Sequence, residues 1–339
     1  MKRAKSLFDR IVSYENLREA WLKARRGKTS KSSVINFSRN VNENLKRIQE
    51  RMCSEPPNLS PYVQFKINAP KERVISVVPF CDRVIHHAII NVLEPVFERQ
   101  LIYHTYACRV RKGTHAAARY ALRCAKSAQC FLKLDVRKYF DSIDHSILKR
   151  QLCRIIKDAR CLELLFSVVD SYSSCVAVAD KGLPIGNLTS QFFANLYLSP
   201  LDHFVLETLK PRGCVRFYVR YMDDMLFFAD SMTELKALFM AVKHYCAEKL
   251  LLSLKEPSFG FVRHGVLFLG WRIQSKNVSV LGKTRHRMKQ KLELIASELD
   301  SGLISEEKAI ERRRSVFAAR KLTVMSRDFA IMSIETPFL

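Results

Sequence analysis

The chain has 339 residues, 48% of them hydrophobic, which is enough for two or three subdomains around a substantial core. Its net charge of +24, from 57 basic and 33 acidic residues, indicates a polyanionic partner: nucleic acid before an anionic membrane surface. No apolar run approaches the length of a membrane span, and the basic opening MKRAKSLFDR lacks a signal-peptide pattern, so we expect a cytoplasmic protein. The ten cysteines show neither C-x-x-C pairs nor zinc spacing, which predicts reduced thiols.

The first part of the chain predicts helices and then a hairpin. Apolar side chains recur at helical spacing over residues 4–26 and again from about 34 to 52. Residues 62–79 alternate apolar and polar side chains around a turn at Ala69-Pro70, which indicates a β-hairpin. Lys71 and Arg73 lie on its second arm and share a face, where two cations can clamp a triphosphate. Simple solvent exposure of the two side chains is the alternative.

A helix from Arg83 to about Arg99 follows, and Asp82 stands where an N-cap is expected. The next loop, 103–115, is basic and aromatic, so Tyr103 and Tyr106 can stack on bases. A further helix is expected to begin at about residue 115.

Residues 131–136, FLKLDV, indicate a short buried strand with one carboxylate, Asp135, near its end. Sheets of mixed α/β proteins bind ligands outside the carboxyl ends of their strands. A plain strand-end turn residue is the alternative interpretation of Asp135. Asp144 is expected to be the N-cap of a helix at 145–153.

A loop with a defined backbone conformation comes next, because it contains Gly182, Pro184 and Gly186. Thr189 or Ser190 can then start a helix. A long amphipathic helix is predicted for residues 232–252, a β segment for 265–273, and basic helices after about residue 283.

Two adjacent carboxylates, Asp223 and Asp224, interrupt the apolar run FYVRYMDDMLFF at 217–228. The run has two β-type arms, so it predicts a hairpin with the aspartates at or beside its turn. Two like charges about 4 Å apart repel by roughly 1 kcal/mol in water and by about 4 kcal/mol at an effective dielectric constant near 20. A divalent cation relieves this repulsion, and oxygen-only ligands favour magnesium. Ordinary Asp-Asp turn chemistry is the alternative.

These pieces occur in an order that resembles the palm of reverse transcriptases. The strings FLKLDVRKYFDSIDH and RYMDDMLFF resemble the two catalytic motifs of that family. The string LPIGNLTSQFFANLYLSPLDHFV resembles the corresponding motif of reverse transcriptases from diversity-generating retroelements. Ile185 precedes Gly186 here, where group II intron, retron and retroviral enzymes usually carry Gln, and Ser190-Gln191 closes the motif.

The resemblance implies an α+β fold, a right-hand polymerase with fingers, a palm whose antiparallel sheet carries the catalytic aspartates, and a helical thumb. We expect an N-terminal helical extension at 1–60, fingers and palm at 61–272, and a basic thumb at 273–339. The tail after about Val316 departs from the ending of this group, which predicts a shorter or altered thumb.

The resemblance also implies the roles of residues in the site. Asp135 and Asp223 would bind two Mg²⁺ ions, Asp224 would complete the site, and the backbone carbonyl of Val136 would contact one ion. Lys71, Arg73, Phe140, Ile185 and Gly186 would surround the incoming dNTP, with Phe140 as the steric gate against a ribose 2′-hydroxyl. The residues implied for the template and primer are Gln191, Tyr221 and Met222, together with a primer grip of Phe268, Leu269, Gly270 and Trp271.

A branched alkyl group at Ile185 removes a hydrogen bond worth roughly 0.5–1.5 kcal/mol near the nascent base pair. The resemblance implies error-prone incorporation opposite template adenines, a structured template RNA, a cDNA/RNA duplex, and a small basic accessory protein that forms a pentameric barrel. Two alternatives stay open: a retron, phage-defence or group II intron-type enzyme, and a non-catalytic RNA-binding chaperone or maturase.

Overall fold

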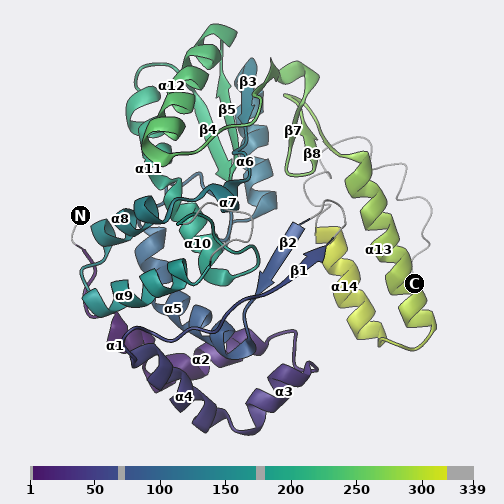
Figure 1. Cartoon of the computed structure of the whole chain (residues 1–339). Coiled ribbons are helices and arrows are strands. Elements are labelled where there is room, and N and C mark those ends of the chain that lie inside the picture. The colour runs from purple at the N-terminus through teal and green to yellow at the C-terminus, as the bar shows by residue number, and fades with distance from the viewer. Residues whose placement is uncertain (1–2, 68–72, 173–179, 319–339) are drawn as a thin grey trace. The chain divides into compact units, whose positions relative to one another are not determined.

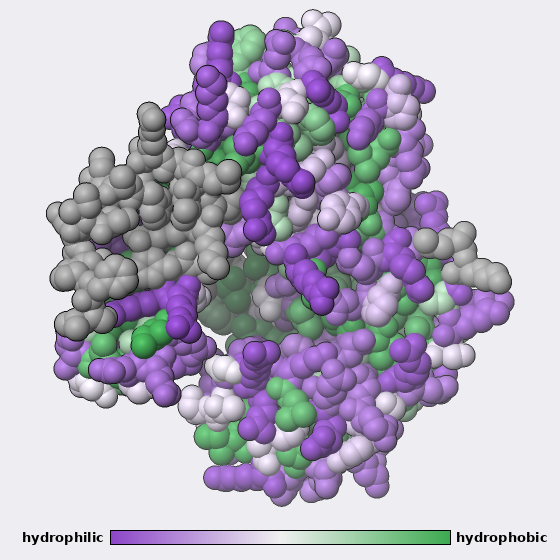
Figure 2. Space-filling model, turned by 180° about the vertical axis from the view of Figure 1, so that it is seen from behind, coloured by the Kyte–Doolittle hydropathy of each residue, from purple (hydrophilic) through white to green (hydrophobic). Residues whose placement is uncertain are grey.

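The computed structural model describes residues 3–67, 73–172 and 180–318 (Figure 1). The chain divides into two compact units. Unit 1 comprises Met1–Tyr103, Val136–Phe204 and Val242–Lys255, and unit 2 comprises His104–Asp135, Val205–Ala241 and Glu256–Leu339. Within the described residues, no helix combines the length and the apolar character needed to cross a bilayer. Figure 2 shows hydrophilic side chains over most of the described surface on the face it draws.

Unit 1 is mainly helical and is built around α5 (Phe80–Glu98), which is apolar on most of its circumference. Helices α2 and α10 make the most extensive contacts with α5, and α1, α3 and α4 also pack on it. The other elements of unit 1 are α1 (Phe8–Ile11), α2 (Tyr14–Arg25), α3 (Ser32–Arg39), α4 (Val41–Cys53), the hairpin β1 (Val63–Ile67) and β2 (Arg73–Val77), α7 (Tyr139–Ser142), α8 (His145–Ile155), α9 (Ala159–Asp170), α10 (Leu188–Tyr197), α11 (Ser199–His203) and the end of α12 (Met232–Leu250).

Unit 2 contains an antiparallel sheet in the order β4-β5-β3-β6, formed by β3 (Cys130–Leu134), β4 (Phe217–Tyr221), β5 (Asp224–Ala229) and β6 (Ser258–Phe261). Helix α6 (Thr114–Lys126) packs against β4 and β5, and its alanines share one core with Val219, Leu226 and Phe228. The small sheet β7 (Val266–Phe268), β8 (Trp271–Ile273) and β9 (Val278–Val280) adds Phe268 and Trp271 to the same core. The remaining elements are the π-helix η1 (Phe204–Leu209), which begins at the end of unit 1, the 3-10 helix η2 (Val262–His264), α13 (Gly282–Asp300) and α14 (Glu306–Ala318).

Several sequence predictions are confirmed. Residues 62–79 form the hairpin β1–β2, although its turn at Ala69-Pro70 lies outside the described residues. The Asp144 carboxylate caps α8 by accepting hydrogen bonds from the backbone amides of Ser146 and Ile147. The cysteines that the structure describes are all free thiols.

Other sequence predictions were wrong in ways that local chemistry explains. The first expected helix is broken before Tyr14, because the Ser13 hydroxyl caps a new helix by accepting from the Asn16 amide. The second is broken at Asn40, whose backbone lies outside the helical region (φ −129°, ψ 59°). Asp82 is no cap: α5 already starts at Phe80.

The Asp82 carboxylate is instead buried inside unit 1. It forms an ion pair with Arg51 (2.8 Å) and accepts hydrogen bonds from the Ser60 amide (2.6 Å) and hydroxyl (3.1 Å). Asn187, not Thr189 or Ser190, precedes the first residue of α10, and the Thr189 hydroxyl bonds His86 Nδ1 inside the core. Tyr106 is also buried, so its ring is not available for base stacking.

Candidate active site

The two adjacent aspartates lie at a tight hairpin turn in unit 2. Strand β4 pairs with β5 up to Tyr221 opposite Asp224, so Met222 and Asp223 form a two-residue connection. Met222 adopts a left-handed backbone with φ 55°, as such hairpin turns require. The predicted hairpin is therefore confirmed, with Asp223 in its turn and Asp224 as the first residue of β5.

The third aspartate comes from the neighbouring strand. Strand β3 runs antiparallel to β5 with Leu134 opposite Met225. Continuing this register by one residue places Asp135 across from Asp224. The sheet order thus brings together acidic residues from two distant parts of the sequence at one end of the same sheet.

Asp224 lies in an environment that disfavours its own charge. Its side chain is only 20% exposed, and its Oδ1 is buried without a hydrogen-bond partner among the described residues. Burial raises the pKa of Asp224 to about 6; Lys133 opposes the shift, and the negative charges of Asp135 and Asp223 add to it. Three acidic groups therefore influence one another at this end of the sheet.

Lys133 partly neutralises this cluster. Its ammonium lies 3.2 Å from Asp224 Oδ2 and also donates to the backbone carbonyl of Leu267 at 3.0 Å. Sequence reasoning missed this residue, although the signal was present: Lys133 and Asp135 are two positions apart in FLKLDV, the run predicted to be one strand, and so would share a face.

Arg220 is the second residue that sequence reasoning missed. Its side chain is completely buried in β4, and its guanidinium Nη1 donates to the Met222 carbonyl at 2.9 Å. The bond ties the turn that carries Asp223 to the strand before it. A charged residue inside the otherwise apolar string FYVRY was the signal that could have found it.

These acidic residues fit a magnesium site that is completed by other ligands. Among the residues that the structure describes, no three Asp, Glu, His or Cys side chains converge into a ready-made metal cluster. Magnesium commonly keeps several waters and binds through one or two carboxylates together with substrate phosphates. The unpartnered Oδ1 of Asp224 and the oxygen-only donor set suit such an ion.

A second group of predicted site residues lies in unit 1. Phe140 is partly exposed on α7 and packs edge-on against Tyr139, and its carbonyl accepts from the Leu183 amide at 2.8 Å. The Gly182 amide bonds the Ile143 carbonyl at 2.8 Å, so the glycine loop is anchored beside α7.

The glycine loop also approaches the hairpin of unit 1. Gly186 has φ +112°, and a Cβ built there would lie 3.9 Å from both the Ser76 carbonyl and the Ile75 side chain of β2. The left-handed backbone, not lack of space, therefore requires glycine there. Unit 1 thus places Gly186 next to β2, the strand that begins with Arg73, and Ile185 beside it is partly exposed.

The remaining predicted positions are spread over both units. Lys71 lies outside the described residues. Val136 forms a bridge with Leu254 in unit 1, and Gln191 is partly buried on α10. Residues 265–273 form a hairpin and not one β segment: Phe268 and Trp271 are buried, while Leu269 and Gly270 occupy its partly exposed turn.

Comparisons with known proteins show which family the chain resembles. Residues 65–273 match the family model described as reverse transcriptase (RNA-dependent DNA polymerase). Protein YkfC of Escherichia coli (strain K12) is 24% identical over 247 residues, which are 61% of this chain and 64% of YkfC. The group II intron-encoded protein LtrA of Lactococcus lactis subsp. cremoris is 28% identical over 149 residues, 42% of this chain and 24% of LtrA.

A solved structure shares the fold. Apo telomerase from Candida tropicalis, truncated from its C-terminal domain, superposes with a TM-score of 0.50 at 13% identity, over 66% of this chain and 56% of that one. At this identity the likeness concerns the fold alone. The chain spans less than two thirds of the length of the relatives named above.

Proposed function

The chain belongs to the reverse transcriptase family, and we propose that it acts as a magnesium-dependent, RNA-directed DNA polymerase. The observation that supports this most is the placement of Asp135 across from Asp224, whose carboxylate is desolvated and lacks a partner for Oδ1. Such a group binds a cation with little further loss of hydration.

In this proposal, Asp135, Asp223 and Asp224 hold Mg²⁺, with the Val136 carbonyl as a further oxygen ligand. Two bound ions would activate the primer 3′-hydroxyl and stabilise the triphosphate and the leaving pyrophosphate. Lys133 would hold the Asp224 carboxylate in place, and Arg220 would fix the turn between the two strands. The turn Leu269–Gly270 would contact the primer, because Phe268 and Trp271 are buried.

The nucleotide-binding side would be built from unit 1. Phe140 is partly exposed and is held through its own backbone by the Leu183 amide, which suits a ring that must reject a ribose 2′-hydroxyl. Lys71 and Arg73 would contact the triphosphate, and Ile185 and Gly186 the nascent base pair. Gln191, Tyr221 and Met222 would face the template and primer.

We further propose that the enzyme is of the diversity-generating type and makes errors opposite template adenines. The support is the sequence around Ile185, where a partly exposed alkyl side chain stands beside Gly186 in place of a group that can hydrogen-bond. Its natural partners would then be a structured template RNA and a small basic accessory protein. The similarity to LtrA favours a second candidate, a group II intron-type enzyme with ordinary fidelity.

One experiment separates these candidates. The purified chain extends a DNA primer on a defined RNA template with Mg²⁺ and four dNTPs, and the cDNA is sequenced for errors by template base. We expect errors concentrated at adenines, reduced roughly two- to tenfold by Ile185→Gln and unchanged in the control Ile185→Val. An even error spectrum would favour the group II intron type, and no extension would contradict both candidates.

A further inference from the structure

A cationic pocket in unit 1 has no part in the proposed polymerase chemistry. It lies between α8 and the last turns of α12, with Pro200 of α11 at its edge, and has a volume of about 390 Å³. This is within the range of roughly 300–1,000 Å³ typical of small-molecule sites. Its residues are Ile147, Arg150, Gln151, Arg154, Pro200, Tyr245, Glu248, Lys249 and Leu250.

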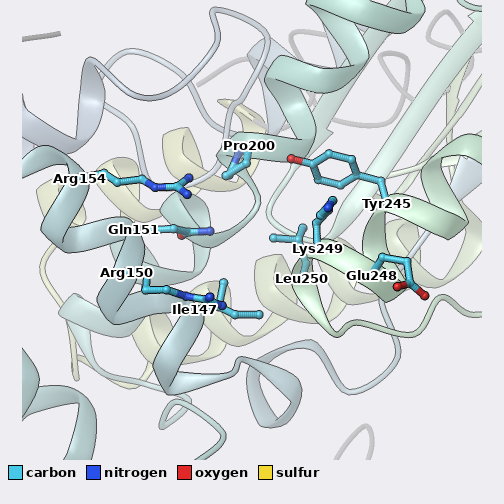
Figure 3. A pocket seen from close by; sticks show the side chains of 9 residues that line it. All are labelled: Ile147, Arg150, Gln151, Arg154, Pro200, Tyr245, Glu248, Lys249 and Leu250. Carbon is cyan, nitrogen blue, oxygen red and sulfur yellow. The ribbon is translucent and has the colours of Figure 1, made fainter.

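Helical spacing explains why these side chains converge. On α8, Ile147, Arg150, Gln151 and Arg154 are spaced i, i+3, i+4 and i+7, so they share one face. On α12, Tyr245 and Lys249 are four residues apart and also share a face. Figure 3 shows Arg154 and Gln151 reaching from α8 toward Tyr245 and Lys249, while the Glu248 carboxylate turns away from the α8 side chains.

The three cations of the pocket lack protein counter-ions. Arg150, Arg154 and Lys249 form no ion pair and no side-chain hydrogen bond with any residue that the structure describes. By contrast, the neighbouring Lys149 pairs with Asp170 at 2.6 Å. All three residues are exposed, so solvent screens their mutual repulsion, and a bound anion would supply the ionic contacts that they do not make within the described part of the chain.

The walls of the pocket are held in place. Gln151 Nε2 donates to the Tyr197 carbonyl (3.1 Å), and the Tyr197 hydroxyl donates to the Leu250 carbonyl (2.6 Å), which joins α8, α10 and α12. The Tyr245 ring stacks on Phe204, with centroids 4.6 Å apart and planes 18° apart. The site is therefore organised before any ligand binds, which lowers the ordering cost of binding.

A buried polar atom of the pocket also lacks a partner. Gln151 is 8% exposed, and its Oε1 makes no hydrogen bond in the described part of the chain. Leaving such an acceptor unpaired costs roughly 1–3 kcal/mol, which a hydroxyl or amine of a ligand would relieve. An anion that carries a hydrogen-bond donor satisfies both the cations and Gln151.

We propose that this pocket binds a nucleotide unit, with its phosphate held by Arg150, Arg154 and Lys249 and a sugar or base donor directed to Gln151. The phosphate can belong to a free nucleotide or to an RNA chain, and the two sources share the same chemistry. The competing explanation is that Arg154 and Lys249 only compensate the negative C-terminal ends of α8 and α12.

Direct binding to the full chain, measured in EDTA to prevent catalysis, tests the proposal. One arm measures the affinity of a short single-stranded RNA as a function of salt, and the other measures the affinity of adenosine 5′-monophosphate. The variant is Arg150→Gln with Arg154→Gln. The charge-matched control is Arg18→Gln with Arg39→Gln, which removes two exposed arginines from α2 and α3.

If RNA is the ligand, the slope of log affinity against log salt should fall by about 0.7 in the pocket variant, because the pocket holds one phosphate and each phosphate contact contributes roughly 0.7 for single strands. If a free nucleotide is the ligand, the pocket variant should lose adenosine monophosphate binding and keep the RNA slope. Equal effects of both double variants, or no effect on either ligand, would overturn the proposal.

One further variant guards against a folding defect, and another tests the contact to Gln151. Lys249→Gln should weaken the same ligand without changing the melting temperature. Gln151→Met also loses the bond to the Tyr197 carbonyl, so its melting temperature is measured beside its affinity, which should fall roughly two- to tenfold for one lost ligand hydrogen bond. Unchanged affinity in the Lys249 variant would contradict phosphate binding at this pocket, and unchanged affinity in the Gln151 variant would contradict the donor contact.

Discussion

Replacing Arg220 with Met should destabilise the protein and disturb the turn that carries Asp223. The Arg220 side chain is completely buried, and its guanidinium donates to the Met222 carbonyl at 2.9 Å. Met fills most of the same volume but cannot donate. The substitution therefore removes a hydrogen bond without opening a large cavity.

The size of the effect follows from the type of bond. A hydrogen bond from a charged donor contributes roughly 1.5–3 kcal/mol, so we expect the free energy of unfolding to fall by about 2–3 kcal/mol. Met222 needs a left-handed backbone, with φ 55°, and loses the contact that holds its carbonyl. A displacement of about 1 Å at a catalytic group can cost a hundredfold in rate.

Two assays measure the two consequences: urea denaturation for stability, and single-nucleotide incorporation at several Mg²⁺ concentrations for the site. Arg216→Met is the matched control, because Arg216 precedes the same strand and pairs with Asp230 at the surface, where an ion pair contributes about 0–1 kcal/mol. Arg220→Met should need more Mg²⁺ for half-maximal rate, and Arg216→Met should not. Equal stability and equal Mg²⁺ dependence of the two variants would refute the role given to Arg220.

Three more predictions concern other parts of the molecule. Gly260→Ala should lower the free energy of unfolding by about 1–3 kcal/mol in urea denaturation, because the new Cβ would lie 2.6 Å from Phe131 Cζ. Gly282→Ala is the control: the space around Gly282 is open, so this variant should be as stable as the wild type. Burial lowers the pKa of His86 to about 4. The buried neutral imidazole therefore contributes to the free energy of unfolding above pH 6.5, and this contribution is lost as the pH falls toward 4, by about 2 kcal/mol at pH 5. His86→Gln should remove that part of the pH dependence, and parallel stability curves for the two proteins would contradict it. Phe140→Val should admit ribonucleotides in competition with dNTPs, and retained discrimination would argue against a steric gate.

Local patterns were sufficient for part of the fold. The hairpin at 217–228 and the strand before Asp135 follow from short β-type runs beside a turn, and the Asp144 cap follows from its place before an amphipathic run. The breaks at Ser13 and Asn40 were missed because helical periodicity continues across both positions. Periodicity reports which face is buried and does not register a change of helix axis.

Tertiary partners decide the rest. Asp is a residue type that commonly caps helices, but the role of Asp82 depends on Arg51 and Ser60, which are distant in sequence. The Lys133–Asp224 ion pair likewise depends on how β3 and β5 are aligned, and no single segment contains that alignment. Motif order located the aspartates, whereas the interactions that shift the pKa of Asp224 became visible only with the strands in register.

The central claim is that Asp135, Asp223 and Asp224 together support metal-dependent DNA synthesis. The most direct test is extension of a DNA primer annealed to RNA by the purified chain in Mg²⁺, compared with Asp223→Asn and with EDTA. The wild-type chain should extend the primer, while the variant should keep its fold and its affinity for RNA and extend nothing. Extension by the variant at the wild-type rate, or in EDTA, would contradict the account.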